Sequence, residues 1–280
     1  MWTSAYHELE PEEAVERLFE VGWRWLEFSY EHWRKLAERR RPTTHFRKLG
    51  RFFERLGVKV PQMHGPMFNV CDPDRKKVKE NVKLTKQVLK WARELGVRWV
   101  VLHPGSAPMA EDEKALEEVR RAHLRWLGEI VETAKEAGVG IAIENACDGD
   151  GQGRRVFGSI PSELLWLVRN LDPERVGICW DTGHAHLQRL DQRRAIKALG
   201  KHLVATHIDD NHQNTDEHLL PFDGTVDWKS VLSGLKEARY SGLFNMEVGG
   251  AMAKVPLTVR DEKLRYALEL CKAFVEGRVP

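Results

Sequence analysis

The sequence predicts an α/β protein built as one (β/α)8 barrel, a TIM barrel, with residues 1–280 as a single domain. Six short apolar segments each end on a side chain of a type that binds metals, namely His64, His103, Glu144, Asp181, His207 and Glu247. Most of these side chains recur at intervals of about 40 residues, which is the length of one strand, one helix and their loops. Functional residues at the C-terminal ends of successive strands are typical of barrel enzymes.

Eight β-branched or aromatic segments alternate with amphipathic charged segments, and this alternation favours a parallel sheet. The expected strands are Trp2–His7, Trp25–Ser29, Lys59–His64, Trp99–His103, Gly140–Glu144, Gly177–Asp181, Leu203–Ile208 and Leu243–Val248. Three expected helices end on Gly57, Gly96 and Gly138, where glycine can adopt the left-handed conformation that caps a helix. The segment Arg75–Glu94 is expected to be an outer helix, because its apolar residues recur at helical spacing among charged ones.

Composition and charge set limits on the class of protein. With 44 basic and 42 acidic residues and a net charge of +2, the chain has no charge excess that requires a nucleic acid or a membrane as partner. Its four cysteines form no CxxC pair, which predicts a reduced, cytoplasmic setting. The first residues lack a signal-peptide pattern, and no apolar run approaches the roughly 20 residues of a membrane span. We therefore expect a soluble cytoplasmic protein without a membrane partner.

Four of the strand-end side chains are expected to share one divalent cation. The last four strands supply Glu144, Asp181, His207 and Glu247. Neighbouring strands lie roughly 4.8 Å apart, so side chains at matching height can converge on one ion. Three carboxylates and one imidazole suit Mn²⁺, Zn²⁺, Mg²⁺ or Co²⁺. One such carboxylate alone is more often a helix cap or a salt-bridge partner. Four metal-binding side chains at the ends of successive strands favour a metal site.

Two further histidines are expected at the same end of the barrel. His64 precedes Gly-Pro and His103 precedes Pro-Gly, and these residues force a tight exit from the strand that leaves the imidazole at the mouth. A histidine at a strand end is often only packed or hydrogen-bonded. Two of them on adjacent strands beside a carboxylate cluster favour contact with a metal or a substrate.

The segments after the last strands offer more candidates. His184 lies three residues after Asp181 and is expected to line the same pocket and contact substrate, whereas His186 is expected to be a helix-start residue. Asp216 and His218 are two residues apart, which places their side chains on one side of an extended segment and suits a shared ion. The alternative is that the side chains of Asp216 and His218 are exposed to solvent and bind no ion. Aromatic residues that could wall the pocket are Trp25, Phe68 and Phe222.

Six short strings near the expected strand ends carry a family resemblance, and they are VLHPGS, IEN, WDTGHAH, THIDDN, DEHLLPFDGTVDW and NMEV. Together they resemble the xylose isomerase-like barrel superfamily. That superfamily includes sugar phosphate isomerases and epimerases as well as the type IV apurinic/apyrimidinic (AP) endonucleases. The resemblance covers nearly the whole chain, and it implies a metal-dependent enzyme and favours a homo-oligomer.

The resemblance also implies a role for nine residues. A central metal would be held by Glu144, Asp181, His207 and Glu247. A second metal, as in the endonuclease branch, would be held by His64, His103 and Glu144, and a third by His184, Asp216 and His218. The GQG string at residues 151–153 also resembles the endonuclease branch, whereas the start of the chain and the PFDGTVDW loop resemble the isomerase and epimerase branch.

The first functional hypothesis is a divalent-metal-dependent isomerase or epimerase that acts on a small-molecule sugar or sugar phosphate. Its reaction would move a proton through an enediolate, with Glu144 and Glu247 as general base and acid and with His184, His64 and His103 as substrate contacts. One alternative is a three-metal AP-endonuclease-type phosphodiesterase or phosphatase, although the near-neutral charge makes a nucleic acid the less favoured partner. Another is a dehydratase of a polyol or keto-acid. One central ion is expected, and up to three under the first alternative.

Overall fold

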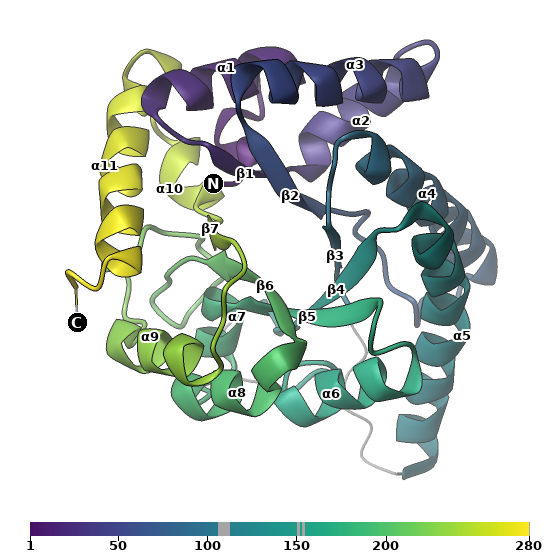
Figure 1. The fold of residues 1–280 in the computed structure, drawn as a ribbon. Helices are drawn as coiled ribbons and strands as arrows, with labels where there is room; N and C mark the ends of the chain where they lie inside the picture. Colours follow the sequence, from purple (N-terminus) through teal and green to yellow (C-terminus); the bar gives the residue numbers. More distant parts are fainter. Residues whose placement is uncertain (106–112, 150–151, 153–154, 280) are drawn as a thin grey trace.

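The computed structural model describes residues 1–105, 113–149, 152 and 155–279, and the structural statements below concern these residues. Seven parallel strands form one sheet that curls into a nearly closed barrel, with helices around it (Figure 1). The strands, in spatial order, are β1 (Trp25–Phe28), β2 (Lys59–His64), β3 (Trp99–Leu102), β4 (Gly140–Glu144), β5 (Val176–Asp181), β6 (Leu203–Ile208) and β7 (Phe244–Met246). The predicted α/β barrel is therefore confirmed.

The first predicted strand, Trp2–His7, is wrong. Only Trp2 pairs in a β-bridge, with Glu27, and the following residues form a short 3-10 helix, η1 (Thr3–Tyr6). The backbone N–H of Trp2 donates to the carbonyl of Met246, and the N–H of Glu27 donates to the carbonyl of Met1. These two bonds let the first two residues of the chain bridge the gap between β1 and β7, so a full strand is not needed to join the edges of the sheet.

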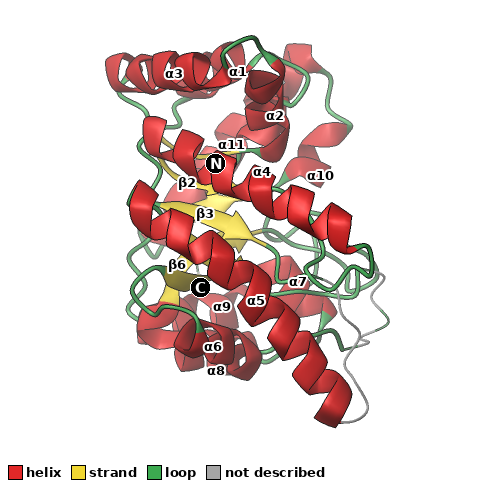
Figure 2. Cartoon of the chain, turned by 90° about the vertical axis from the view of Figure 1, so that its right-hand side faces the viewer, coloured by secondary structure: helices red, strands yellow, loops and turns green. Residues whose placement is uncertain are grey.

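The helices alternate with the strands along most of the chain and shield the barrel from solvent (Figures 1 and 2). They are α1 (Pro11–Val21), α2 (Tyr30–Glu38), α3 (Pro42–Leu56), α4 (Arg75–Glu94), α5 (Glu113–Ala137), α6 (Pro161–Asn170), α7 (Thr182–Leu187), α8 (Gln192–Leu199), α9 (Trp228–Glu237), α10 (Gly249–Ala253) and α11 (Leu257–Val275), with a second 3-10 turn, η2 (Gly200–His202). The predicted helix over Arg75–Glu94 has the expected bounds. The glycines after three helices, Gly57, Gly96 and Gly138, all have a positive φ, as their role as left-handed caps requires.

Side chains alternate between two cores along each strand. On β3, Val100 and Leu102 face the large apolar core, which also contains residues from the surrounding helices, whereas Val101 belongs to a small separate cluster with Ala142, Cys179 and Ala205. This small cluster fills part of the barrel interior.

Among the described residues, no helix is long and apolar enough to cross a membrane.

Candidate metal centre

The six predicted strand-end residues lie at one end of the barrel. His64, Glu144 and Asp181 are the last residues of their strands, and His207 is the next to last of β6. His103 and Glu247 directly follow β3 and β7. Because the strands are parallel, all six occupy the C-terminal mouth, where barrel enzymes build their sites.

Four of these residues form a compact, buried group at the mouth, and we call them the central group: Glu144, Asp181, His207 and Glu247. Each offers one ligand atom, and these atoms all lie within 4.8 Å of one another. His207 Nδ1 is 2.7 Å from Glu247 Oε2 and 3.2 Å from Glu144 Oε1. The strands bring them to this height, since Asp181 of β5 is in register with His207 of β6.

The donor set of the central group fits a divalent cation. Each of its four side chains keeps one buried polar atom without a well-directed hydrogen bond to any described residue, although two of these atoms, His207 Nδ1 and Glu247 Oε2, are 2.7 Å apart as an ion pair. The four atoms are Glu144 Oε2, Asp181 Oδ2, His207 Nδ1 and Glu247 Oε2. Buried polar atoms are ordinarily satisfied, because leaving one unpaired costs about 1–3 kcal/mol or more. A cation bound among them would satisfy all four at once.

The two carboxylate oxygens of Asp181 have different surroundings. Its Oδ1 accepts a hydrogen bond from the N–H of His184 and so caps the N-terminus of α7, while Oδ2 stays free. The side chain of Asn145 fixes the backbone of Asp181 by accepting from its N–H (2.6 Å) and donating to its carbonyl (2.9 Å). The helix-cap interpretation and the metal interpretation of Asp181 are thus compatible.

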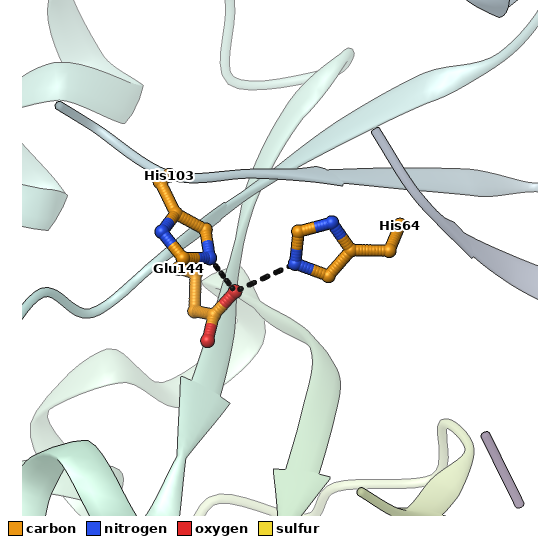
Figure 3. Close-up of side chains that lie close together, drawn as sticks. All are labelled: His64, His103 and Glu144. Carbon is orange, nitrogen blue, oxygen red and sulfur yellow. Dashed lines mark ion pairs between the residues drawn. The ribbon is translucent and has the colours of Figure 1, made fainter. Parts of the chain in front are cut away.

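The two mouth histidines lie against one carboxylate oxygen of Glu144 (Figure 3). Glu144 Oε2 is 3.2 Å from His103 Nε2 and 3.7 Å from His64 Nε2. The three residues form a second group with metal-ligand spacing, and it shares Glu144 with the central group. His64 is buried, whereas His103 is partly exposed.

The third predicted set also comes together, at the carboxylate of Asp216. Asp216 Oδ2 lies 3.3 Å from His184 Nε2 and 3.1 Å from His218 Nε2. Asp210 holds the loop that carries Asp216 and His218. Its carboxylate accepts hydrogen bonds from the backbone N–H groups of Phe222 and Val226 and from the indole N–H of Trp228. Solvation alone does not describe these side chains.

The charges of the site are balanced between acids and imidazoles. Burial, followed by the charges of nearby carboxylates such as Glu144 and Glu247, raises the pKa of Asp181 to about 7. Burial opposes protonation of His64, but the Glu144 carboxylate outweighs it and raises the pKa of His64 to about 9. Burial also opposes protonation of His207, but charges around it, including those of Glu247 and Glu27, raise its pKa well above its ordinary value. A bound divalent ion would supply the same positive charge that these protonated imidazoles supply.

A cavity of about 290 Å³ opens beside the metal-ligand groups. Its lining includes Phe68, His103, Cys147, His184 and Asp216. This volume is near the lower end of the range for small-molecule sites, roughly 300 Å³, and the mixed polar lining suits a small polar molecule. Of the predicted substrate contacts, His103 and His184 line the cavity, and His64 does not.

Of the three aromatic residues predicted to line the cavity, two do not line it. Trp25 begins β1 and so lies at the opposite end of the barrel, which makes its assignment to the pocket wrong. Phe222 packs against Phe274, with ring centroids 5.5 Å apart, and does not line the cavity. Phe68 does line it.

The expectation that His186 is a helix-start residue is wrong, because it lies in the last turn of α7, where its Nε2 is 2.8 Å from Thr225 Oγ1. Of the GQG string, positions 151 and 153 lie outside the described residues.

Three residues at or below the site were not predicted. Asp209 lies 3.3 Å from His218 and forms a metal-spaced group with Asp216 and His218, and Cys147 forms another with His184 and Asp216. Glu27, in the middle of β1, is 2.9 Å from His207 Nε2. A carboxylate between two apolar residues of a predicted strand was the signal for Glu27. No comparable signal marked Cys147.

Comparison with known proteins points to one family. The model of the family described as xylose isomerase-like TIM barrel matches residues 15–273. A solved structure described as a D-tagatose 3-epimerase-like protein superposes with a TM-score of 0.76 at 25% identity, and the match covers 98% of each chain.

Curated relatives are similar over shorter segments. An inosose isomerase of Bacillus velezensis is 25% identical over 182 residues, 62% of this chain and 62% of that protein. A probable endonuclease 4 of Acholeplasma laidlawii is 32% identical over 127 residues, 44% of this chain and 40% of that protein. The chain spans 63% and 52% of the length of the first two curated relatives that it matches.

Proposed function

The chain belongs to the xylose isomerase-like TIM-barrel family, and from that premise we propose that it is a divalent-metal-dependent isomerase or epimerase of a small sugar or sugar phosphate. The observation that carries the proposal is the central group, with four ligand atoms within 4.8 Å of one another and one unsatisfied buried atom on each side chain. Relatives described as an inosose isomerase and as a D-tagatose 3-epimerase-like protein support the class of substrate.

The residues proposed to hold the ion are the four members of the central group. When bound, the ion would act as a Lewis acid that stabilises negative charge on substrate oxygens. Three carboxylates and one imidazole form a hard, mainly oxygen set, which suits Mn²⁺, Mg²⁺ or Co²⁺ as well as Zn²⁺.

Proton transfer is assigned to the two glutamates. Glu144 and Glu247 come from β4 and the end of β7, so a substrate at the mouth would meet carboxylates from two separated strands. One glutamate would remove the proton from the carbon next to the carbonyl, and the other would return a proton to the enediolate. His184 and His103 line the adjoining cavity and would orient substrate oxygens by hydrogen bonds.

Exchange of substrate hydrogen with solvent tests this proposal. The metal content of the purified protein is measured first, and the protein is then incubated in D₂O with a broad panel of ketoses and ketose phosphates. We expect mass spectrometry to detect one deuterium on the carbon next to the carbonyl of at least one substrate. The absence of exchange across the panel, with metal bound, would contradict the proposal.

A second candidate function is a three-metal phosphodiesterase of the AP-endonuclease type. Its support is the pair of additional groups that flank the central one, with His64 and His103 on one side and Asp216 and His218 on the other. In that reaction the three groups would hold the ions, with Glu144 a member of two of them, and the ions would supply Lewis acidity for activating water and for stabilising charge on phosphate oxygens.

Two measurements separate the candidates. A metal count near one per chain favours the isomerase, and a count near three favours the phosphodiesterase. Cleavage of abasic-site DNA, tested at low salt with added Zn²⁺ or Mn²⁺, checks the second reaction directly, because phosphate contacts weaken as salt rises. Intact DNA after long incubation would eliminate it.

A further inference from the structure

Glu27 is a carboxylate in the interior of the barrel, below the central group. It lies in β1 and has no exposed surface. Its side chain accepts hydrogen bonds from Gln62 on β2 and from Asn245 on β7, the latter at 2.6 Å. A buried charge of this kind is tolerated only where donors surround it. Strands β2 and β7 therefore each contribute a donor to the carboxylate of Glu27 on β1.

The third partner of Glu27 is a proposed metal ligand. His207 Nε2 lies 2.9 Å from Glu27 Oε2 and 3.2 Å from Oε1. The other ring nitrogen, Nδ1, faces Glu247 and Glu144 in the central group. The imidazole of His207 therefore connects the interior carboxylate with the mouth, and each nitrogen has a different neighbour.

This arrangement determines which nitrogen can bind a cation. A carboxylate has no proton to donate, so Nε2 must carry the hydrogen when it bonds to Glu27. In the neutral imidazole the lone pair is then on Nδ1, the nitrogen that points to the central group. Metal-binding histidines ordinarily donate their other N–H to a carboxylate or carbonyl in this way.

We propose that Glu27 is a positioning residue for metal binding, which fixes the His207 ring with Nε2–H toward itself and Nδ1 toward the ion. The inference rests on the metal-binding part of the proposed function and is independent of the reaction.

Metal affinity of variants tests the proposal without a substrate. Glu27→Gln has the same shape but lacks the charge, and its amide meets the amide donors of Gln62 and Asn245. We expect it to bind Zn²⁺ about 10- to 100-fold more weakly than the wild type in a chelator competition assay. The matched control is Gln62→Ala, which alters the same buried cluster without touching His207, and we expect it to weaken binding by less than about threefold.

A purely structural role for Glu27 predicts a different pattern. Gln62→Ala would then weaken Zn²⁺ binding as much as Glu27→Gln does, or folded Glu27→Gln would bind as the wild type does, and either result overturns the proposal. If the wild type bound no divalent ion at all, the proposed function would fail with it, so the two failures are distinguishable.

A spectroscopic measurement on the wild type covers the case in which Glu27→Gln does not fold. In protein labelled with ¹⁵N-histidine and loaded with Zn²⁺, the imidazole nitrogens report which one carries hydrogen. We expect His207 to show a protonated Nε2 and a metal-bound Nδ1. A protonated Nδ1 or a metal-bound Nε2 would contradict the role assigned to Glu27.

Discussion

Two neighbouring layers of the barrel interior contain buried glutamates in opposite situations. Glu27 is surrounded by three donors, from Gln62, His207 and Asn245. Glu144 and Glu247, about one layer nearer the mouth, each keep an oxygen without a hydrogen bond to any described residue. All three carboxylates are at most 3% exposed, so the difference lies in their partners and not in their burial.

The difference indicates what each layer is for. A buried carboxylate with a full set of donors is stable by itself and can hold a neighbour in position. The mouth carboxylates instead lie against imidazoles, and they need positive charge, either from protonated histidines or from a metal ion. Under the proposed function, the interior layer supports the mouth layer, and the mouth layer would bind the cation. The predictions below test this division.

The largest effect is expected from the mouth glutamates. Replacing Glu144 or Glu247 with Gln keeps the shape but removes the group that accepts a proton, so each variant should lose about 10²- to 10⁴-fold of the deuterium-exchange rate. The rate is measured at saturating metal to separate catalysis from binding. Glu237→Gln, which removes only surface pairings with Arg193 and Lys197, serves as the control and should keep the wild-type rate. Equal rates in all variants would refute the assignment.

Removal of the ion is expected to destabilise the protein strongly. A ligand present at 1,000 times its Kd stabilises the native state by about 4 kcal/mol. For a domain of this size that corresponds to a shift in Tm of about 10 °C. Thermal unfolding of the metal-loaded protein, with and without a chelator, measures the shift. An unchanged Tm would show that the mouth carboxylates need no cation.

His32 extends the comparison to histidines. It is buried beside Thr3, Ser29 and the Tyr6 carbonyl, and burial lowers its pKa to about 4, whereas the facing carboxylate raises that of His64 to about 9. A histidine with a lowered pKa contributes stability that is present above pH 6.5 and is lost as the pH falls toward 4.

The free energy of unfolding measures this contribution. Between pH 7 and pH 5, metal-free wild-type protein should lose about 2 kcal/mol more than His32→Gln, which has no such group to protonate. Both proteins contain the same mouth residues, so the difference between them isolates His32. Parallel pH profiles for the two would contradict its assignment as a neutral buried group.

The smallest effect separates the two candidate functions. In a one-ion isomerase, the double variant with His64→Asn and His103→Asn keeps the central group intact. Its metal content should therefore stay near that of the wild type, close to one ion per chain. Elemental analysis of both proteins measures this. A wild-type count near three that falls in the double variant would favour the phosphodiesterase instead.

The sequence predicted the barrel and the mouth because both depend on local patterns. Strand-end residues such as Glu144 and Asp181 can be read from a short apolar segment and its last side chain. The segment Trp2–His7 looked equally strand-like, but whether it pairs depends on β1 and β7, whose edges it meets only at Trp2. Sequence pattern alone does not contain that information.

Long-range contacts explain the other omissions. Glu27 and His207 are 180 residues apart in the chain, and nothing near Glu27 indicates that the two side chains meet. Asp209 lies in a string that already supplies His207, and its partner His218 lies on the loop that follows. The sequence does not place Trp25 correctly, because an aromatic residue at the start of a strand and one at its end look alike in sequence, although they lie at opposite ends of the barrel.

Anomalous diffraction from crystals loaded with Mn²⁺ or Zn²⁺ tests the central claim most directly. The account predicts a strong peak among the carboxylates of Glu144, Asp181 and Glu247, within bonding distance of His207 Nδ1. A folded, metal-soaked protein with no peak there, or with the ion bound to His207 Nε2, would contradict it.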